Sequence, residues 1–183
     1  MRVNVEDISD GGISLTFAEE AESFPSLLEL SRNGECHFSM PLAIDLHIRP
    51  IAQLFEADGR FATRVRLTCG RCLRNYETPL AADFVLSFSR QLPETVDPSR
   101  HAEIELRAED IGLILFQGDE IDLREAVQEE VLMALPMRAL CRPDCKGLCT
   151  RCGADLNQGD CSCGRKVFNP KFAVLKDLKL DQT

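Results

Sequence analysis

The sequence predicts an α+β protein in which an antiparallel sheet, one that could close into a barrel, carries one main amphipathic helix and a cysteine-rich, zinc-binding C-terminal segment. Three observations support this class. Apolar and polar residues alternate through most of the first ninety positions, which is the period of half-buried strands. A single long stretch with helical periodicity follows near residue 123, and six of the nine cysteines lie between Cys141 and Cys163. We expect residues 1–120 to form a mainly β domain carrying the first cysteine pair. Residues 121–183 would form the helix and a zinc-binding tail packed on it, both within one structural unit.

The composition limits the class of protein. With 183 residues and 44% hydrophobic content, the chain is long enough for one domain with a hydrophobic core and a small additional segment. No apolar run reaches the length that crosses a bilayer, and the N-terminus lacks the basic and apolar regions of a secretory signal. We therefore expect a soluble, cytoplasmic protein. Its net charge of −9 is uneven, because nine Lys or Arg face five Asp or Glu from Arg138 onward. That imbalance fits either a nucleic-acid-facing tail or an ordinary solvated surface.

Several strands are predicted in the first half of the chain. Residues 13–17 alternate as one strand, and residues 24–30 form a short helix that Asn33-Gly34 ends. A long alternation over residues 36–48 is interrupted by Pro41, so this strand is either bent or at an edge. Asp58-Gly59 predicts a hairpin turn. The alternation resumes on both sides of residues 69–72, which places the first cysteine pair at a turn between antiparallel strands.

The second half is expected to contain the main helix. Short strands are predicted near residues 104–106 and 111–116, and the helix then starts with Asp122 as N-cap and Glu125 completing a capping-box pattern. Pro136 ends it. We expect this helix to pack on the sheet and to set the cysteine segment beside Cys69. A further helix is predicted from Asn169-Pro170, with an apolar stripe that docks on the core.

Eight cysteines form four pairs, which is the number needed for two zinc sites closed by four thiolates each. Disulfides require an oxidising compartment, a redox C-x2-C is expected near a βαβ pattern, and neither common ferredoxin spacing is present. Zinc is therefore the preferred interpretation. The ninth cysteine, Cys36, lies on the apolar face of a predicted strand and is interpreted as a core residue. The predicted ligands are Cys69, Cys72, Cys141, Cys145, Cys149, Cys152, Cys161 and Cys163.

Four cysteine pairs can share two ions in three ways. The pairs 149/152 and 161/163 are only eight residues apart, so closing them on one ion has a low entropic cost. The pairs 69/72 and 141/145 would then share the other ion and tie the tail to the sheet. We favour this arrangement, and the two crossed arrangements stay open.

Several of these segments resemble a known family. IDLREAVQEEVLMALPM, followed by C-x3-CKGLCTRCGADLN and C-x-C, resembles the bacterial YceD-like family, the large ribosomal RNA subunit accumulation proteins. LTCGRCLRNYETPL resembles the family's first cysteine pair, and NPKFAVLKDLK its C-terminal signature. The resemblance covers most of the chain from about Arg60. It implies a non-enzymatic factor that supports production or stability of large-subunit ribosomal RNA.

The residues themselves favour the same class of function. The motifs for phosphate binding, dinucleotide binding, zinc proteolysis and serine hydrolysis are absent, and a closed four-cysteine zinc site has no open position for catalysis. A zinc-stabilised surface that contacts rRNA or a ribosomal protein in a pre-ribosomal particle is the first hypothesis. With no Trp and one Tyr, a base-stacking platform is not expected. The alternative is a thiol-based redox or zinc-responsive switch. The predicted contact residues are Arg71, Arg74, Arg142, Lys146, Arg151, Arg165 and Lys166.

Overall fold

The computed structural model describes residues 1–90 and 112–163. Four sequence-based predictions lie outside these residues: the strand at 104–106, the helix that starts at Asn169-Pro170, and the partner contacts of Arg165 and Lys166.

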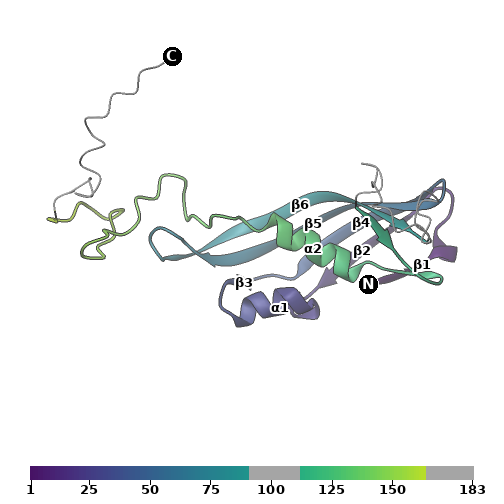
Figure 1. Ribbon diagram of the computed structural model, residues 1–183, viewed down its shortest axis with the longest axis horizontal. Coiled ribbons are helices and arrows are strands. Elements are labelled where there is room, and N and C mark those ends of the chain that lie inside the picture. Colours follow the sequence, from purple (N-terminus) through teal and green to yellow (C-terminus); the bar gives the residue numbers. More distant parts are fainter. Residues whose placement is uncertain (91–111, 164–183) are drawn as a thin grey trace, which may run out of the picture.

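A single mixed sheet dominates the fold (Figure 1). All of its pairings are antiparallel except that between β6 and β7, which is parallel. Within the described residues the sheet is open, with β2 and β7 at its two ends, so the α+β prediction is confirmed and the sheet does not close into a barrel. The strands, in spatial order, are β2 (Ile13–Glu19), β4 (Leu42–Ile51), β5 (Leu54–Thr68), β6 (Asn75–Ser89) and β7 (Leu113–Leu115), with β3 (Cys36–Phe38) also paired to β5.

A second, two-stranded sheet joins the N-terminus to the middle of the chain. Here β1 (Arg2–Asn4) pairs antiparallel with β8 (Glu120–Asp122), and Arg2 makes ion pairs with both Glu120 and Asp122. The expected domain boundary at residues 120/121 therefore falls within a paired strand. Two single-turn 3₁₀ helices, at Val5–Asp7 and Ala21–Ser23, complete the N-terminal region.

The predicted interruption at Pro41 is a break between two strands. Residues 39–41 separate β3 from β4, yet both strands pair with β5. Proline has no amide hydrogen to donate to a neighbouring strand. Because the strand is broken at Pro41, no hydrogen bond from this residue is required. The hydroxyl of Thr63 donates a hydrogen bond to the Met40 carbonyl at 2.7 Å, which holds the break against β5.

The hairpin turn predicted at Asp58-Gly59 is wrong. Both residues lie in the interior of β5, paired with β4 on one side and β6 on the other, and the chain turns instead between β4 and β5 at Ala52, whose φ is 54°. Gly59 has a packing role. A Cβ at this position would overlap the ring of Phe84 on β6 and lie 2.7 Å from Cδ2 of Leu46 on β4.

Two helices cover the buried face of the sheet, and both contribute to one hydrophobic core (Figure 1). Helix α1 (Pro25–Arg32) confirms the short helix expected before Asn33-Gly34. Helix α2 (Arg124–Ala134) confirms the main helix, although its N-cap is Leu123. Asp122 still caps the helix, because its carboxylate accepts the Arg124 amide at 3.0 Å. The core is centred on Phe24, Leu27, Ile44, Phe61, Val65, Phe88, Leu123, Val127 and Val131.

None of the helices in the described residues is long and apolar enough to cross a membrane.

Candidate metal centres

The first half-site is a tight turn at the tip of the longest hairpin. Strands β5 and β6 pair over their full lengths, and residues 69–74 join them. The Cys69 amide donates to the Arg74 carbonyl and the Leu73 amide to the Cys69 carbonyl, both at 2.9 Å. Leu73 adopts the left-handed conformation, with φ 57°, that this turn requires. The prediction of a turn between antiparallel strands at the first cysteine pair is confirmed.

The chain after α2 is held against this tip. The Gly70 amide donates to the Ala139 carbonyl at 2.8 Å, and Nη1 of Arg71 donates to the Cys145 carbonyl at 2.8 Å. The expectation that α2 delivers the cysteine segment to Cys69 is therefore confirmed. In Figure 1 this segment, coloured green to yellow, continues beyond the hairpin tip and away from the sheet.

Four sulfur atoms meet at the tip and form what we call the first tetrad: Cys69, Cys72, Cys141 and Cys145. All four lie within 4.8 Å of one another. Sγ of Cys69 lies 3.8 Å from that of Cys145, and Sγ of Cys72 lies 3.7 Å from that of Cys141. A tetrahedron with metal–sulfur bonds of about 2.3 Å has edges of about 3.8 Å. The spacing therefore fits a tetrahedral thiolate site. Three of the four residues are buried and Cys141 is half-buried.

The second tetrad consists of Cys149, Cys152, Cys161 and Cys163, whose sulfur atoms also lie within 4.8 Å of one another. Its first pair sits in a turn in which the Gly153 amide donates to the Cys149 carbonyl at 2.8 Å, and Gly153 has a φ of +74°. Three of the four cysteines are half-buried and Cys152 is exposed. The structure thus groups the half-sites in the arrangement that loop closure favours.

The electrostatics of both tetrads suit a divalent cation. Backbone hydrogen bonds from Cys141 and Cys72 lower the pKa of Cys69 to about 6, and those from Cys152 and Arg151 lower that of Cys149 to about 6. Desolvation raises the pKa of Cys141 to about 12, and a hydrogen bond with Cys152 raises that of Cys163 to about 12. One thiolate therefore forms readily in each tetrad, whereas the thiols of Cys141 and Cys163 resist ionisation. A cation that attracts all four sulfurs reverses this resistance, and binding releases protons.

Disulfide bonds do not account for either tetrad. All nine cysteines are free, and in the first tetrad the sulfur separations of 3.7 and 3.8 Å far exceed the roughly 2.05 Å of an S–S bond. Cys36 belongs to neither tetrad and is 4% exposed in the core, as predicted.

The four predicted contact arginines that the structure describes, Arg71, Arg74, Arg142 and Arg151, lie near the tetrads, and each also makes a contact within the protein. Arg74 pairs with Asp155 at 2.9 Å, and Nη2 of Arg142 donates to the Asn157 side chain at 2.8 Å. Arg151 donates to the Cys163 carbonyl at 2.8 Å. Their first role is therefore to hold the cysteine loops together.

Two residues that the cysteine spacing did not predict, Asp155 and Asn157, link the tetrads. Both lie in the loop between the two halves of the second tetrad, and the Asp155 carboxylate accepts the Asn157 amide at 2.9 Å. An Asp side chain that accepts the backbone amide two residues later forms a common type of loop turn. The Asp155-x-Asn157 sequence could therefore have predicted this turn.

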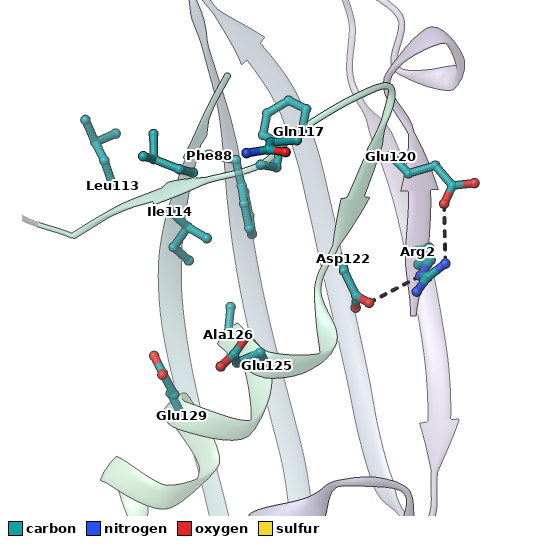
Figure 2. A pocket seen from close by; sticks show the side chains of 12 residues that line it. Arg2, Phe88, Leu113, Ile114, Gln117, Glu120, Asp122, Glu125, Ala126 and Glu129 are labelled. Carbon is teal, nitrogen blue, oxygen red and sulfur yellow. Dashed lines mark hydrogen bonds and ion pairs between the residues drawn. The ribbon is translucent and has the colours of Figure 1, made fainter. Parts of the chain in front are cut away.

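A separate pocket lies at the opposite end of the sheet, between β7, β8 and the start of α2 (Figure 2). Its volume is about 600 Å³, and apolar side chains such as Phe88 and Ile114 meet an acidic rim that includes Glu125 and Glu129. None of its described lining residues is Cys, His, Ser or Lys. The pocket gives no basis for assigning a reaction.

Comparison with known proteins finds a matching family model and several relatives. A large ribosomal RNA subunit accumulation protein YceD family model matches residues 57–179. A chloroplastic YCED homolog 1 from Arabidopsis thaliana is 24% identical over 156 residues, which is 76% of this chain and 49% of the plant protein. An uncharacterized protein from Mycobacterium tuberculosis is 25% identical over 137 residues, covering 75% of this chain and 61% of that protein.

The chain thus spans about half the length of the plant relative and under two thirds of the mycobacterial one. No solved structure is a significant match. The family model nevertheless covers most of β5, all of β6, helix α2 and all eight paired cysteines. The chain therefore belongs to the YceD family of large ribosomal RNA subunit accumulation proteins.

Proposed function

We propose that this protein is a non-enzymatic factor for large-subunit ribosomal RNA accumulation, and that two zinc ions hold its contact surface. The observation that supports the proposal is the pair of four-cysteine groups at one end of the molecule, inside the region that matches the family. Cys69, Cys72, Cys141 and Cys145 would hold one ion. Cys149, Cys152, Cys161 and Cys163 would hold the other. Closed thiolate sites of this kind stabilise a fold and leave no open position for catalysis.

The proposed contact surface consists of the hairpin tip and residues 138–163, which we call the cysteine module. Its partner is the large-subunit rRNA or a ribosomal protein within a pre-ribosomal particle. The Lys146 side chain makes no hydrogen bond or ion pair with the described residues, so its ammonium group is available to a phosphate or carboxylate. Arg71, Arg74, Arg142 and Arg151 retain further N–H donors beyond those that they use internally.

Most of the net positive charge available for contact with RNA lies at the C-terminal end of the sequence. The cysteine module contains six Lys or Arg and three Asp, and two zinc ions each bound by four thiolates would add a charge of about −2 apiece. The module itself is then close to neutral. Residues 165–183, which include Arg165 and Lys166, add five Lys or Arg against two Asp. These residues would provide the electrostatic attraction to RNA.

Sedimentation of the tagged protein from growing cells through a density gradient tests the assembly role. Migration with immature large-subunit particles at low salt supports it. Loss of that migration as salt rises indicates contacts to phosphates, whereas a flat salt dependence indicates a protein partner. Protein found only at the top of the gradient at every salt concentration would contradict binding to the particle.

A charge reversal tests the contact surface. Lys146→Glu is expected to reduce co-migration. Arg32→Glu on α1, which changes the net charge equally but lies outside the cysteine module, is the matched control and should migrate as wild type. Equal behaviour of the two variants would remove Lys146 from the contact surface.

The alternative thiol-based switch is tested by the same protein treated with mild peroxide. Zinc loss accompanied by a change in co-migration would favour it.

A further inference from the structure

We infer that the two metal sites form one coupled unit, in which the loop closed by the second tetrad orients the ligands of the first, and that Asn157 is the positioning residue. This inference rests on the proposed zinc sites. It adds that the sites do not bind metal independently.

The loop between Cys152 and Cys161 belongs to the second tetrad, but two of its polar side chains, Asp155 and Asn157, contact residues of the first half-sites. Nδ2 of Asn157 donates to Sγ of Cys145 at 3.5 Å. Oδ1 of Asn157 accepts the backbone amide of Lys146, the residue after Cys145, at 2.8 Å. The side-chain amide of Asn157 therefore contacts both the sulfur of Cys145 and the backbone of the next residue, Lys146.

Asn157 is itself held in place by Asp155. Oδ1 of Asp155 accepts hydrogen bonds from the Asn157 backbone amide at 2.9 Å and from Asn157 Nδ2 at 2.6 Å. Oδ2 of Asp155 pairs with Arg74 at 2.9 Å. Arg74 closes the turn that carries Cys69 and Cys72. The loop of the second tetrad thus contacts both halves of the first.

The backbone connects the two sites as well. The Leu148 amide donates to the Arg71 carbonyl at 3.1 Å, and the Leu156 amide donates to the Gly147 carbonyl at 2.9 Å. Leu148 and Asp155 form an isolated antiparallel bridge. When a metal joins the two ends of the second tetrad, residues 153–160 become a closed loop, and its ordering is transmitted to Cys145 through these contacts.

A hydrogen bond to a coordinating atom from outside the ligand set typically changes metal affinity by about 10- to 100-fold. A donor aimed at Sγ of Cys145 stabilises its thiolate and fixes its direction. We therefore expect a filled second site to strengthen metal binding at the first, and by reciprocity a filled first site to strengthen binding at the second.

The test uses the full chain loaded with Zn²⁺ and measures how fast a colorimetric chelator removes metal. In Asn157→Ala, release from the first site should be about 10-fold faster or more, while zinc content before the challenge remains two per chain. Asn33→Ala, an exposed asparagine beside α1, is the matched control and should release zinc at the wild-type rate.

A second variant gives an independent measurement. Cys149→Ser/Cys152→Ser removes the second site, and Co²⁺ titration then reports on the first through its thiolate charge-transfer absorption. Weaker Co²⁺ binding than in the wild-type first site supports the coupling. Circular dichroism confirms that the sheet is folded in each variant.

The outcomes separate this inference from the proposed function. Two zinc ions that leave Asn157→Ala at the wild-type rate, or an unchanged Co²⁺ affinity at the first site, would overturn the coupling and leave the zinc sites intact. Wild-type protein that binds neither metal would overturn both.

Discussion

Gly147 lies directly against the backbone carbonyl of Arg71. A Cβ at position 147 would come within 2.9 Å of that oxygen, and Gly147 has a φ of +76°, which is unfavourable for any other residue. The following residue, Leu148, donates its amide to the same carbonyl.

Gly147→Ala should therefore destabilise the protein through both conformation and contact. The left-handed conformation costs about 1–2 kcal/mol, and the clash with a backbone atom adds about 1–3 kcal/mol. Gly34→Ala is the control, because Gly34 has a similar φ of +73° but has nothing within 4 Å of the added Cβ. Chemical denaturation that finds equal losses in the two variants would show that the contact with Arg71 does not matter.

Single serine substitutions should remove one zinc ion each. Cys69→Ser and Cys149→Ser are expected to lower the zinc content from two per chain to one, because each breaks a different tetrad. Elemental analysis of protein purified without chelator measures the content. Cys36→Ala is the control and should retain both ions. Wild-type protein with no bound metal would refute the zinc assignment.

Mild peroxide should attack the second tetrad before the first. Cys152 is exposed, whereas Cys69, Cys72 and Cys145 of the first tetrad are buried, and oxidation of a cysteine depends on its exposure as well as on its thiolate character. A zinc indicator should record one ion before the other, and mass spectrometry should find the first modifications at residues 149–163. Earlier modification of Cys69 or Cys72 would contradict this order.

Cys36 should resist alkylation in the folded protein. Burial raises its pKa to about 11, so almost none of it is thiolate at pH 8. Its thiol favours the folded state below pH 9, and this contribution is lost as the pH rises from about 9 through 11, because the unfolded thiol ionises first. Iodoacetamide should label the exposed Cys152 but not Cys36 in the chelator-treated native protein, and both in denaturant. Equal labelling of Cys36 in the native state would contradict its burial.

Gly59→Ala should destabilise the centre of the sheet. The added Cβ would overlap the Phe84 ring, which is itself packed against Phe61 with ring centroids 6.3 Å apart, so the ring cannot easily move away. Overpacking of this kind costs about 1–3 kcal/mol. Gly11→Ala, whose nearest contact is 3.8 Å away, should cost little. Partial recovery in Gly59→Ala/Phe84→Leu would assign the loss to the ring, and no recovery would assign it elsewhere.

Most of the fold follows from local periodicity. The alternations at β2, β4 and β6 and the apolar stripe of α2 each indicate their element without further information. Gly59 shows where this reasoning fails. Asp-Gly is a common turn sequence, but the chain uses the missing side chain to admit a ring from the neighbouring strand, which only the register between β5 and β6 reveals. The parallel pairing of β7 with β6 likewise depends on tertiary structure.

The candidate sites were largely visible in the cysteine spacing, and loop-closure entropy was enough to favour one grouping of the half-sites. The role of the nearby arginines was not visible. Arg74 and Arg142 look available for RNA in the sequence, yet their partners Asp155 and Asn157 come from a loop whose direction is set only when the tetrads are assembled. The number of arginines in a sequence does not reveal how many of them are engaged by polar or acidic side chains of the same protein.

The two halves of the first tetrad are 69 residues apart between Cys72 and Cys141. A ribosome adds about 5–20 residues per second, so the β5–β6 tip leaves the ribosome roughly 3–14 seconds before the residues that complete the first tetrad. During that interval the nascent chain carries two thiols without their partners. Binding of a metal by all four cysteines would therefore come late in synthesis, after α2 has been made and can dock on the sheet.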